Sequence, residues 1–442
     1  MHVRATATLV ALFALPAIAV PATSQENWDL DAIADGLEAQ VIEWRRDIHQ
    51  NPELSNREFR TAALVAEHLE ALGIEVTTGV AHTGVVGVLH GGRPGPVVAL
   101  RADMDALPVP ERNDLPFRSE VIGEFNGAEV PVMHACGHDA HVAILMGVAE
   151  AFAARRDDIN GTLKFIFQPA EEGPPEGEEG GAKLMREEGV LRNPDVDAIF
   201  GLHMQAQAPV GTIGYRLGPA MASAQDFRIV VKGRQSHGAN PASGIDPIVT
   251  ASQIVLALQT IVSRTLNLTQ NPAVISVGTF HSGLRSNIIP EQVEMLGTIR
   301  TFDPEQTATV HRRIREIATH IAASAGAEAE VTIPVTVSYP VTHNDPELGA
   351  SSVEALRGVA GDERVLETPL IGGAEDFSFF QEEVPGFYFF LGAKPLDVAR
   401  EDASAHHTPG FFVDENGLSL GVKALMAVTL DYMGQSSLST ER

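Results

Sequence analysis

The order of strand-like and helix-like segments along the chain limits its possible folds more than any other feature of the sequence. Buried runs rich in β-branched residues, GVVGVLHG (84–91), GPVVALRADMD (95–105) and GTLKFIFQPAEE (161–172), are mixed with amphipathic helical patterns such as REFRTAALVAEHLEALG (57–73). Strands that alternate with helices are typical of a sheet covered by helices. The sequence therefore predicts an α/β domain with a central, largely parallel sheet flanked by helices.

The pattern changes between residues 222 and 335. There a strand, a long helix, two strands, a second helix and a last strand follow one another, and α/β material resumes after Asp345. This β-α-β-β-α-β order is that of the ferredoxin-like motif. We expect a main domain formed by 25–221 and 336–442, with a ferredoxin-like α+β domain inserted at 222–335.

The first 24 residues have the pattern of a secretory signal peptide. Arg4 precedes an apolar run over 5–20, and small residues follow at Ala17, Ala19 and Ala22. The run is shorter than the ~20 residues that a membrane-spanning helix needs, and we expect no membrane contact. The sequence predicts export to the periplasm or the medium after cleavage near 19–24. A buried N-terminal helix is the alternative interpretation.

The charge of the chain argues against nucleic-acid binding, and its cysteine content excludes an internal disulfide. The chain has 58 acidic and 31 basic residues, for a net charge of −27. Nucleic acid is not an expected partner, because phosphate binding needs a basic surface. The single cysteine, Cys136, rules out a disulfide within the chain although export is predicted.

Residues of the kinds that bind metals gather at predicted strand ends. In open α/β sheets, ligands bind beyond the carboxyl ends of the strands. Each residue alone has an ordinary structural explanation, and their joint position favours a metal site. A mixture of thiolate, imidazole and carboxylate suits Zn²⁺, Mn²⁺, Co²⁺ or Ni²⁺. The candidates are Asp103, Asp105, Cys136, His138, Glu171, Glu172, His203 and the histidines of AHHTPGF (405–411).

Nine short motifs, in order over about 38–430, carry a resemblance to a known family. The sequence resembles the metal-dependent amidohydrolases that include hippurate hydrolase, bacterial aminoacylases and the plant hydrolases of indole-acetyl amino acids. These are relatives of the di-zinc glutamate carboxypeptidases. The motifs are RADMDALPV, MHACGHDAH, FQPAEEG, GLHM, SHGANPASGIDPI, SNIIPE, GTIRTF, GGAEDFSFF and HHTPGFFVDE.

The resemblance implies a site with two divalent transition-metal ions, Zn, Mn, Co or Ni, and a role for each matching residue. Glu171 would be the general base, and Asp105 would orient a ligand imidazole. The inserted domain would be a lid and a possible homodimer contact. From the lid, His237 would hold the substrate's carbonyl oxygen, and Asn287 and Arg300 would meet its carboxylate. The implied ligands are Cys136, shared by the metals or lying between them, His138, Glu172, His203 and His407, the last favoured over His406.

The function that this implies is an exported two-metal amidohydrolase acting on N-acyl amino acids. A dipeptidase or carboxypeptidase on the same scaffold stays open, because the sequence does not identify the acyl side of the substrate. A serine hydrolase built on Ser236 and His237 is disfavoured, since no Gly-x-Ser-x-Gly elbow occurs. A non-catalytic metal- or peptide-binding module is a further alternative, one that would not need Glu171.

Overall fold

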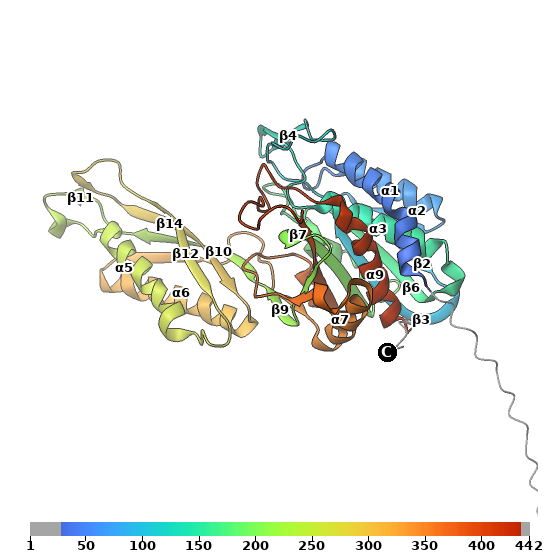
Figure 1. Ribbon diagram of the computed structural model, residues 1–442. Helices are drawn as coiled ribbons and strands as arrows, with labels where there is room; N and C mark the ends of the chain where they lie inside the picture. The colour runs from blue at the N-terminus through green and yellow to red at the C-terminus, as the bar shows by residue number, and fades with distance from the viewer. Residues whose placement is uncertain (1–27, 435–442) are drawn as a thin grey trace, which may run out of the picture.

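Two bodies of unequal size make up the fold (Figure 1). The structure, a computed structural model, describes residues 28–434. The signal peptide predicted at 1–24 lies outside these residues and stays a prediction. The larger body contains an eight-stranded sheet with helices around it, and the smaller body contains a four-stranded sheet with two long helices.

The large sheet has a parallel centre and antiparallel edges, which confirms the predicted fold class. Its four central strands, β6, β3, β7 and β18, run parallel to one another. The outer pairings β1–β2, β2–β6 and β18–β8 are antiparallel. The strands, in spatial order, are β1 (Glu75–Val80), β2 (Gly84–His90), β6 (Asn160–Gln168), β3 (Arg93–Asp103), β7 (Ala198–Pro209), β18 (Gly386–Lys394), β8 (Ile213–Tyr215) and β17 (Val365–Glu367).

Both faces of this sheet are buried, and the residues of β6 show how. Leu163, Phe165 and Phe167 belong to one core cluster, while Ile166 belongs to the other. Successive side chains of a strand point to opposite faces, so an almost continuous apolar run suits a sheet covered on both sides. One cluster includes α1 (Leu30–Gln50), α2 (Phe59–Ala71), α3 (His138–Ala153), α7 (Pro346–Ala360) and α9 (Leu418–Tyr432), and the other includes α4 (Gly181–Glu187) and α8 (Ser378–Gln381).

The smaller body, hereafter the lid domain, has the ferredoxin-like arrangement. Its strands lie in the order β12-β14-β10-β15, and every pairing is antiparallel. Alternate residues of β10, Phe227, Ile229 and Val231, are buried in the lid core with residues of both helices. The elements are β10 (Ser223–Lys232), α5 (Pro247–Thr260), β12 (Val274–His281), β14 (Gln292–Thr301), α6 (Pro304–Ser324) and β15 (Glu328–Thr332).

One lid helix is long and apolar enough to be compared with a membrane span. By length and composition alone, the helix Pro247–Thr265 could cross a membrane, and it is the one such helix among residues 28–434. In the fold, Ala251, Ile254 and Leu258 of this helix are buried in the lid core. A helix that covers one face of a sheet needs this apolar stripe, and the lid accounts for it.

Three short strand pairs complete the fold of residues 28–434. β9 (Gly218–Met221) pairs with β16 (Thr342–Asn344) where the chain enters and leaves the lid domain. β11 (Ser236–His237) pairs with β13 (Ile288–Ile289). Figure 1 places β11 at the end of the lid domain that lies farthest from the main domain. β4 (Ile122–Phe125) and β5 (Ala128–Pro131) form a hairpin on the main domain.

Candidate metal centre and active site

A sharp turn presents the only cysteine and its neighbouring histidine. Cys136 and His138 flank Gly137, and in an extended segment, as local sequence would suggest, both side chains would project to one side. Instead, Gly137 has a left-handed φ of 104° and directly precedes α3. A Cβ on Gly137 would lie 2.9 Å from the Cβ of Met204, so the close approach to β7 needs glycine. Cys136 therefore stands just before α3, and His138 is the first residue of that helix.

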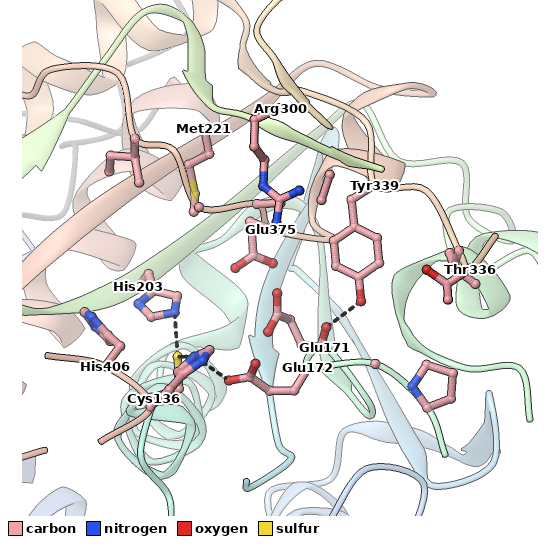
Figure 2. Close-up of a pocket in the computed structure, with 18 of the residues that line it drawn as sticks. Cys136, Glu171, Glu172, His203, Met221, Arg300, Thr336, Tyr339, Glu375 and His406 are labelled. Carbon is pink, nitrogen blue, oxygen red and sulfur yellow. Dashed lines mark hydrogen bonds and ion pairs between the residues drawn. The ribbon is translucent and has the colours of Figure 1, made fainter. Parts of the chain in front are cut away.

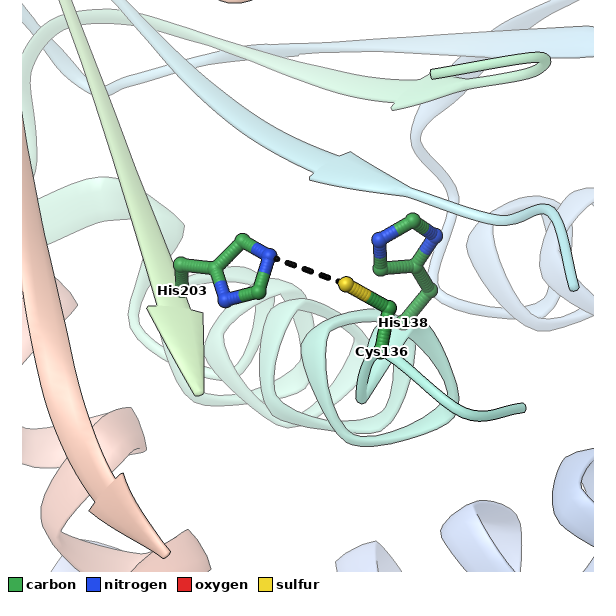
Figure 3. A group of neighbouring side chains, drawn as sticks. All are labelled: Cys136, His138 and His203. Atoms are coloured by element: carbon green, nitrogen blue, oxygen red, sulfur yellow. Dashed lines mark hydrogen bonds between the residues drawn. The ribbon is translucent and has the colours of Figure 1, made fainter. Parts of the chain in front are cut away.

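Two groups of potential ligands share Cys136. One group is Cys136, His138 and His203, and the other is Cys136, Glu172 and His407, each with its ligand atoms within 4.8 Å of one another. The Sγ atom lies 3.4 Å from Nε2 of His203 and 3.3 Å from Nε2 of His407 (Figures 2 and 3). Nε2 of His407 is 3.1 Å from Oε1 of Glu172. A thiolate between two such groups is placed to contact two ions.

The imidazoles expose the correct nitrogen for metal binding. Nδ1 of His138 lies 2.8 Å from the carbonyl oxygen of Asp105, whereas its buried Nε2 has no hydrogen-bond partner. Nδ1 of His203 lies 2.6 Å from the carbonyl oxygen of Met204. A carbonyl can only accept, so both Nδ1 atoms carry a proton, and in the neutral rings both Nε2 atoms offer a lone pair to a metal. These buried nitrogens fit a transition-metal pair.

The protonation state of Cys136 depends on whether cations are bound. Burial and the carboxylate of Glu172 raise the pKa of the Cys136 thiol well above its ordinary value. Two divalent cations would reverse this, because a coordinating thiol is deprotonated outright. The donor set of thiolate, imidazole and carboxylate suits divalent transition-metal ions, and the choice among Zn²⁺, Mn²⁺, Co²⁺ and Ni²⁺ stays a prediction.

The two adjacent histidines of the 405–411 segment have different surroundings. Nε2 of His406 lies 2.8 Å from the carbonyl oxygen of Met204, and its ring packs edge to face with that of His203. His407 instead points to Cys136 and Glu172, with a left-handed φ of 61° and its N–H bound to Ala135. His407 is thus the one brought to the metal centre.

Glu171 lies beside the ligands and keeps its carboxylate free of a strong partner. Its Oε2 is 3.9 Å from Nε2 of His138. Burial and the nearby carboxylates of Glu375 and Asp376 raise the pKa of Glu171 well above its usual value. Its position beside the ligands, with no strong hydrogen-bond partner, suits general-base chemistry.

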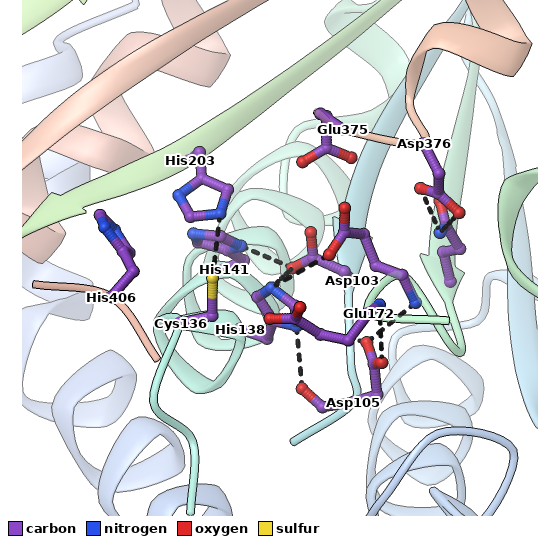
Figure 4. A network of polar contacts seen from close by, with 12 residues as sticks. Asp103, Asp105, Cys136, His138, His141, Glu172, His203, Glu375, Asp376 and His406 are labelled. Atoms are coloured by element: carbon purple, nitrogen blue, oxygen red, sulfur yellow. Dashed lines mark hydrogen bonds and ion pairs between the residues drawn. The ribbon is translucent and has the colours of Figure 1, made fainter. Parts of the chain in front are cut away.

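A buried arginine, Arg101, balances three carboxylates near the site, those of Asp103, Glu375 and Asp376, which are labelled in Figure 4. Arg101 donates to Asp103 at 2.5 Å, to Glu375 at 2.9 Å and to Asp376 at 2.9 Å. Sequence reasoning missed this role of Arg101 and Glu375. The motifs RADMDALPV, which begins with Arg101, and GGAEDFSFF, which contains Glu375, were the available signals for these two residues.

Asp105 contacts both halves of the candidate centre. Its carbonyl and carboxylate lie 2.8 and 3.3 Å from Nδ1 of His138. Its carboxylate accepts the backbone N–H groups of Glu171 and Glu172, each at 3.1 Å, and the hydroxyl of Ser55 at 2.7 Å. Asp105 therefore orients a ligand imidazole and also holds the two glutamates.

A cavity of about 970 Å³ lies over the centre, between the main domain and the lid domain. Figure 2 shows Arg300 of β14 reaching toward it from the side opposite Cys136. The guanidinium of Arg300 donates to Oγ1 of Thr298 and to the carbonyl of Ile299. Among residues 28–434, no carboxylate lies within 4.0 Å of it. The wall also includes Met221, Tyr339, Ile371 and Phe390.

Two predicted substrate contacts lie elsewhere in this chain. His237 is in β11 and Asn287 directly precedes β13, at the far end of the lid domain (Figure 1). Neither residue lines the cavity. The chain brings together the predicted ligands, Glu171, Asp105 and Arg300, but not these two side chains, whose roles stay predictions.

Comparisons with known proteins agree with this arrangement. A family model, Peptidase family M20/M25/M40, matches residues 99–431. Thermostable carboxypeptidase 2 of Saccharolobus solfataricus is 44% identical over 395 residues, which are 89% of this chain and 95% of that protein. N-acetylcysteine deacetylase of Bacillus subtilis is 41% identical over 384 residues, 86% of this chain and 93% of that protein.

A solved structure adds the metal count of a relative. The crystal structure of a dinuclear metal binding peptidase from Bacillus subtilis matches with a TM-score of 0.75 and 36% identity, covering 90% of this chain and 99% of that one. The resemblance read from the sequence is confirmed. With ligand groups that share Cys136, a buried carboxyl beside them and relatives of this kind, the chain belongs to Peptidase family M20/M25/M40 and is a metal-dependent hydrolase of amide or peptide bonds.

Proposed function

We propose that the protein hydrolyses the amide bond of N-acyl amino acids. One observation carries this proposal: Arg300 points into the cavity that covers the metal centre, and it has no carboxylate partner among residues 28–434. Partial burial lowers the pKa of Arg300, yet a guanidinium keeps its charge in proteins. A cation of this kind suits the α-carboxylate of an amino acid, which it can bind through two parallel hydrogen bonds.

The side chains at the site then have separate roles in the reaction. The metal pair, when bound, polarises the amide carbonyl and makes water more acidic. Cys136, His138, Glu172, His203 and His407 would hold it. Glu171 accepts a proton from the attacking water and returns it to the leaving nitrogen. Arg300 holds the carboxylate of the amino acid, so that the scissile bond lies between Arg300 and the centre.

Replacing Arg300 tests the proposal. We expect Arg300→Ala to lower kcat/KM for N-acetyl amino acids about 10- to 100-fold, since a hydrogen bond to a charged group is worth about 1.5–3 kcal/mol. Hydrolysis of the matching substrates with a carboxamide in place of the carboxylate should change little. Arg228→Ala, which removes an exposed arginine paired with Glu294 on the same sheet, is the control. Equal losses on both substrate types would contradict a carboxylate-binding role.

A carboxypeptidase is the second candidate, favoured by the 44% identity to the Saccharolobus enzyme. Both reactions release an amino acid with a free carboxylate, so Arg300 serves either one. They differ only on the acyl side. Kinetics on N-acetyl amino acids, N-acyl groups of increasing size and short peptides, all with the same last residue, separate the two.

We infer that the lid domain also binds a second copy of the chain. β12 is an edge strand of the lid sheet, and edge strands can pair with another chain. Apolar side chains are exposed on this strand, on the following loop and on α5: Val274, Phe280, Leu284, Val249 and Leu256. In a dimer, His237 at the far end of the lid domain is available to the cavity of the other subunit.

Complementation between variants tests the dimer and the role of His237 together. We expect His237→Ala and Glu171→Gln each to be nearly inactive, and a mixture exchanged through partial denaturation to regain activity. Sedimentation should give twice the chain mass. A monomer at micromolar concentration, or a mixture without activity, would contradict the inference.

Export is proposed from the N-terminal pattern alone. We expect the protein purified from its native host to begin between residues 19 and 25 and to come from the periplasm or the medium. N-terminal sequencing of the fractionated protein measures this directly. An intact Met1 in the cytoplasmic fraction would be the contrary result.

A further inference from the structure

The turn that carries Glu171 and Glu172 is held by its backbone. Three consecutive N–H groups each donate to a buried carboxylate: Ala170 to Oε1 of Glu58 at 2.9 Å, then Glu171 and Glu172 to the two oxygens of Asp105 at 3.1 Å. Ala170 has a φ of 52°, in the left-handed region that alanine rarely adopts. Such a conformation persists only where the surroundings hold it in place.

Glu58 is the part of this arrangement that no motif suggested. Its side chain is fully buried at the start of α2 and does not line the cavity. Oε1 accepts the N–H of Asn56 at 3.0 Å in addition to that of Ala170, and Oε2 accepts the hydroxyl of Thr83 at 2.5 Å. With three donors directed at it, Glu58 is fixed in place and can in turn fix Ala170.

The segment around Glu58 reaches the site at two more points. The hydroxyl of Ser55 donates to Oδ2 of Asp105 at 2.7 Å. The side-chain amide of Asn56 donates to the carboxylate of Glu178 and to the carbonyl of Glu179, each at 3.0 Å. Glu178 is part of the cavity wall. Residues 55–58 thus support the carboxylates of the site and the loop beside them.

We propose that Glu58 is a positioning residue of the hydrolytic reaction, which directs Glu171 and Glu172 by binding the backbone of Ala170. The inference rests on the roles given to these two glutamates in the proposed function. A general base is effective only when its carboxylate is within hydrogen-bond reach of the water that it deprotonates. Replacing a residue that supports a metal ligand typically lowers metal affinity or activity 10- to 100-fold.

Three variants of Glu58 and one control test this. Glu58→Ala removes the acceptor, and Glu58→Asp keeps a carboxyl group but shortens the side chain that reaches the N–H of Ala170. Glu58→Gln keeps an oxygen for the N–H groups of Ala170 and Asn56. The control Glu53→Ala removes a nearby carboxylate that accepts the N–H groups of Arg60 and Thr61 but touches nothing in the turn.

Each variant is measured by Mn²⁺ titration of the chelated protein, by kcat and KM, and by thermal unfolding. We expect Glu58→Ala and Glu58→Asp to lose 10- to 100-fold in affinity for one of two Mn²⁺ ions or in kcat, with KM within threefold of wild type. Glu58→Gln should recover both within about threefold. Glu53→Ala should lower the melting temperature only.

The contrary results are equally specific. Wild-type kcat and Mn²⁺ affinity in folded Glu58→Asp would overturn the inference, and so would losses in Glu53→Ala equal to those in Glu58→Asp. Should Glu58→Ala fail to fold, Glu58→Asp and Glu58→Gln decide the question. Turnover of N-acyl amino acids by wild type tests the proposed function separately, because the Mn²⁺ titrations do not depend on the substrate.

Discussion

Glu171→Gln should keep both metal ions and lose turnover. The glutamine fills the same space, and no ligand is removed, so metal content should stay at two ions per chain. Without the base, kcat should fall about 10²- to 10⁴-fold while KM changes little, because proton transfer is an interaction made in the transition state. Metal analysis and steady-state kinetics on one preparation measure both.

The neighbouring glutamate should behave in the opposite way. Glu172→Ala removes a carboxylate that lies 3.1 Å from Nε2 of His407, and we expect the loss of one metal ion along with activity. Glu176→Gln is the control, since Glu176 lines the same cavity on the same loop. If Glu171→Gln loses metal while Glu172→Ala keeps it, the two roles are reversed. If neither variant changes in activity or metal content by more than a few-fold, both residues are ordinary loop carboxylates.

Cys136→Ala should lose both metal ions, because the two ligand groups share only this residue. Replacing a residue that only supports a ligand typically lowers metal affinity or activity 10- to 100-fold. For the loss of a ligand itself, we expect activity to fall at least about 100-fold. Cys136→Ser, which keeps an oxygen donor, should retain part of the metal. Plasma emission analysis of the dialysed variants gives the stoichiometry.

Because the chain has a single thiol, labelling with thiol reagents reports on metal binding by Cys136 alone. Thiol reagents should fail to label Cys136 in the metal-loaded protein and should label it after chelation. Burial and Glu172 raise the pKa of the free thiol, so that it is protonated at neutral pH. Metal binding must expel this proton, and the apparent metal affinity should therefore rise with pH. Equal labelling in both states, or an affinity independent of pH, would argue against a bound thiolate.

The convergence of several candidate site residues could be predicted because it follows from chain direction. Asp103 ends β3, Glu171 follows β6, and His203 lies in β7, three parallel neighbours in the sheet. Parallel neighbours bring their carboxyl ends to one edge, so residues distant in sequence must converge there. Periodicity likewise determined the lid domain, since alternating and helical apolar patterns persist through it.

The close contacts around the site were not predictable in the same way. The left-handed turns at Gly137 and Ala170 depend on Met204 and Glu58, which lie far away in sequence. Local sequence suggested an extended conformation at Gly137, because such a prediction takes only neighbouring residues into account. The choice of His407 over His406 at the centre was suggested by a motif, and its cause is the bond from His406 to Met204.

The sequence by itself determined the fold class, the ligand types and the family, since each depends on patterns within one segment or on the direction of parallel strands. Only the tertiary structure decided which lid residues reach the cavity and which side chains hold the turn that carries Glu171 and Glu172. Arg300 lines the cavity, whereas His237 lies at the far end of the lid. Glu58 meets Ala170 across 112 residues of chain. Such contacts arise from packing between distant segments, and local sequence does not encode that packing.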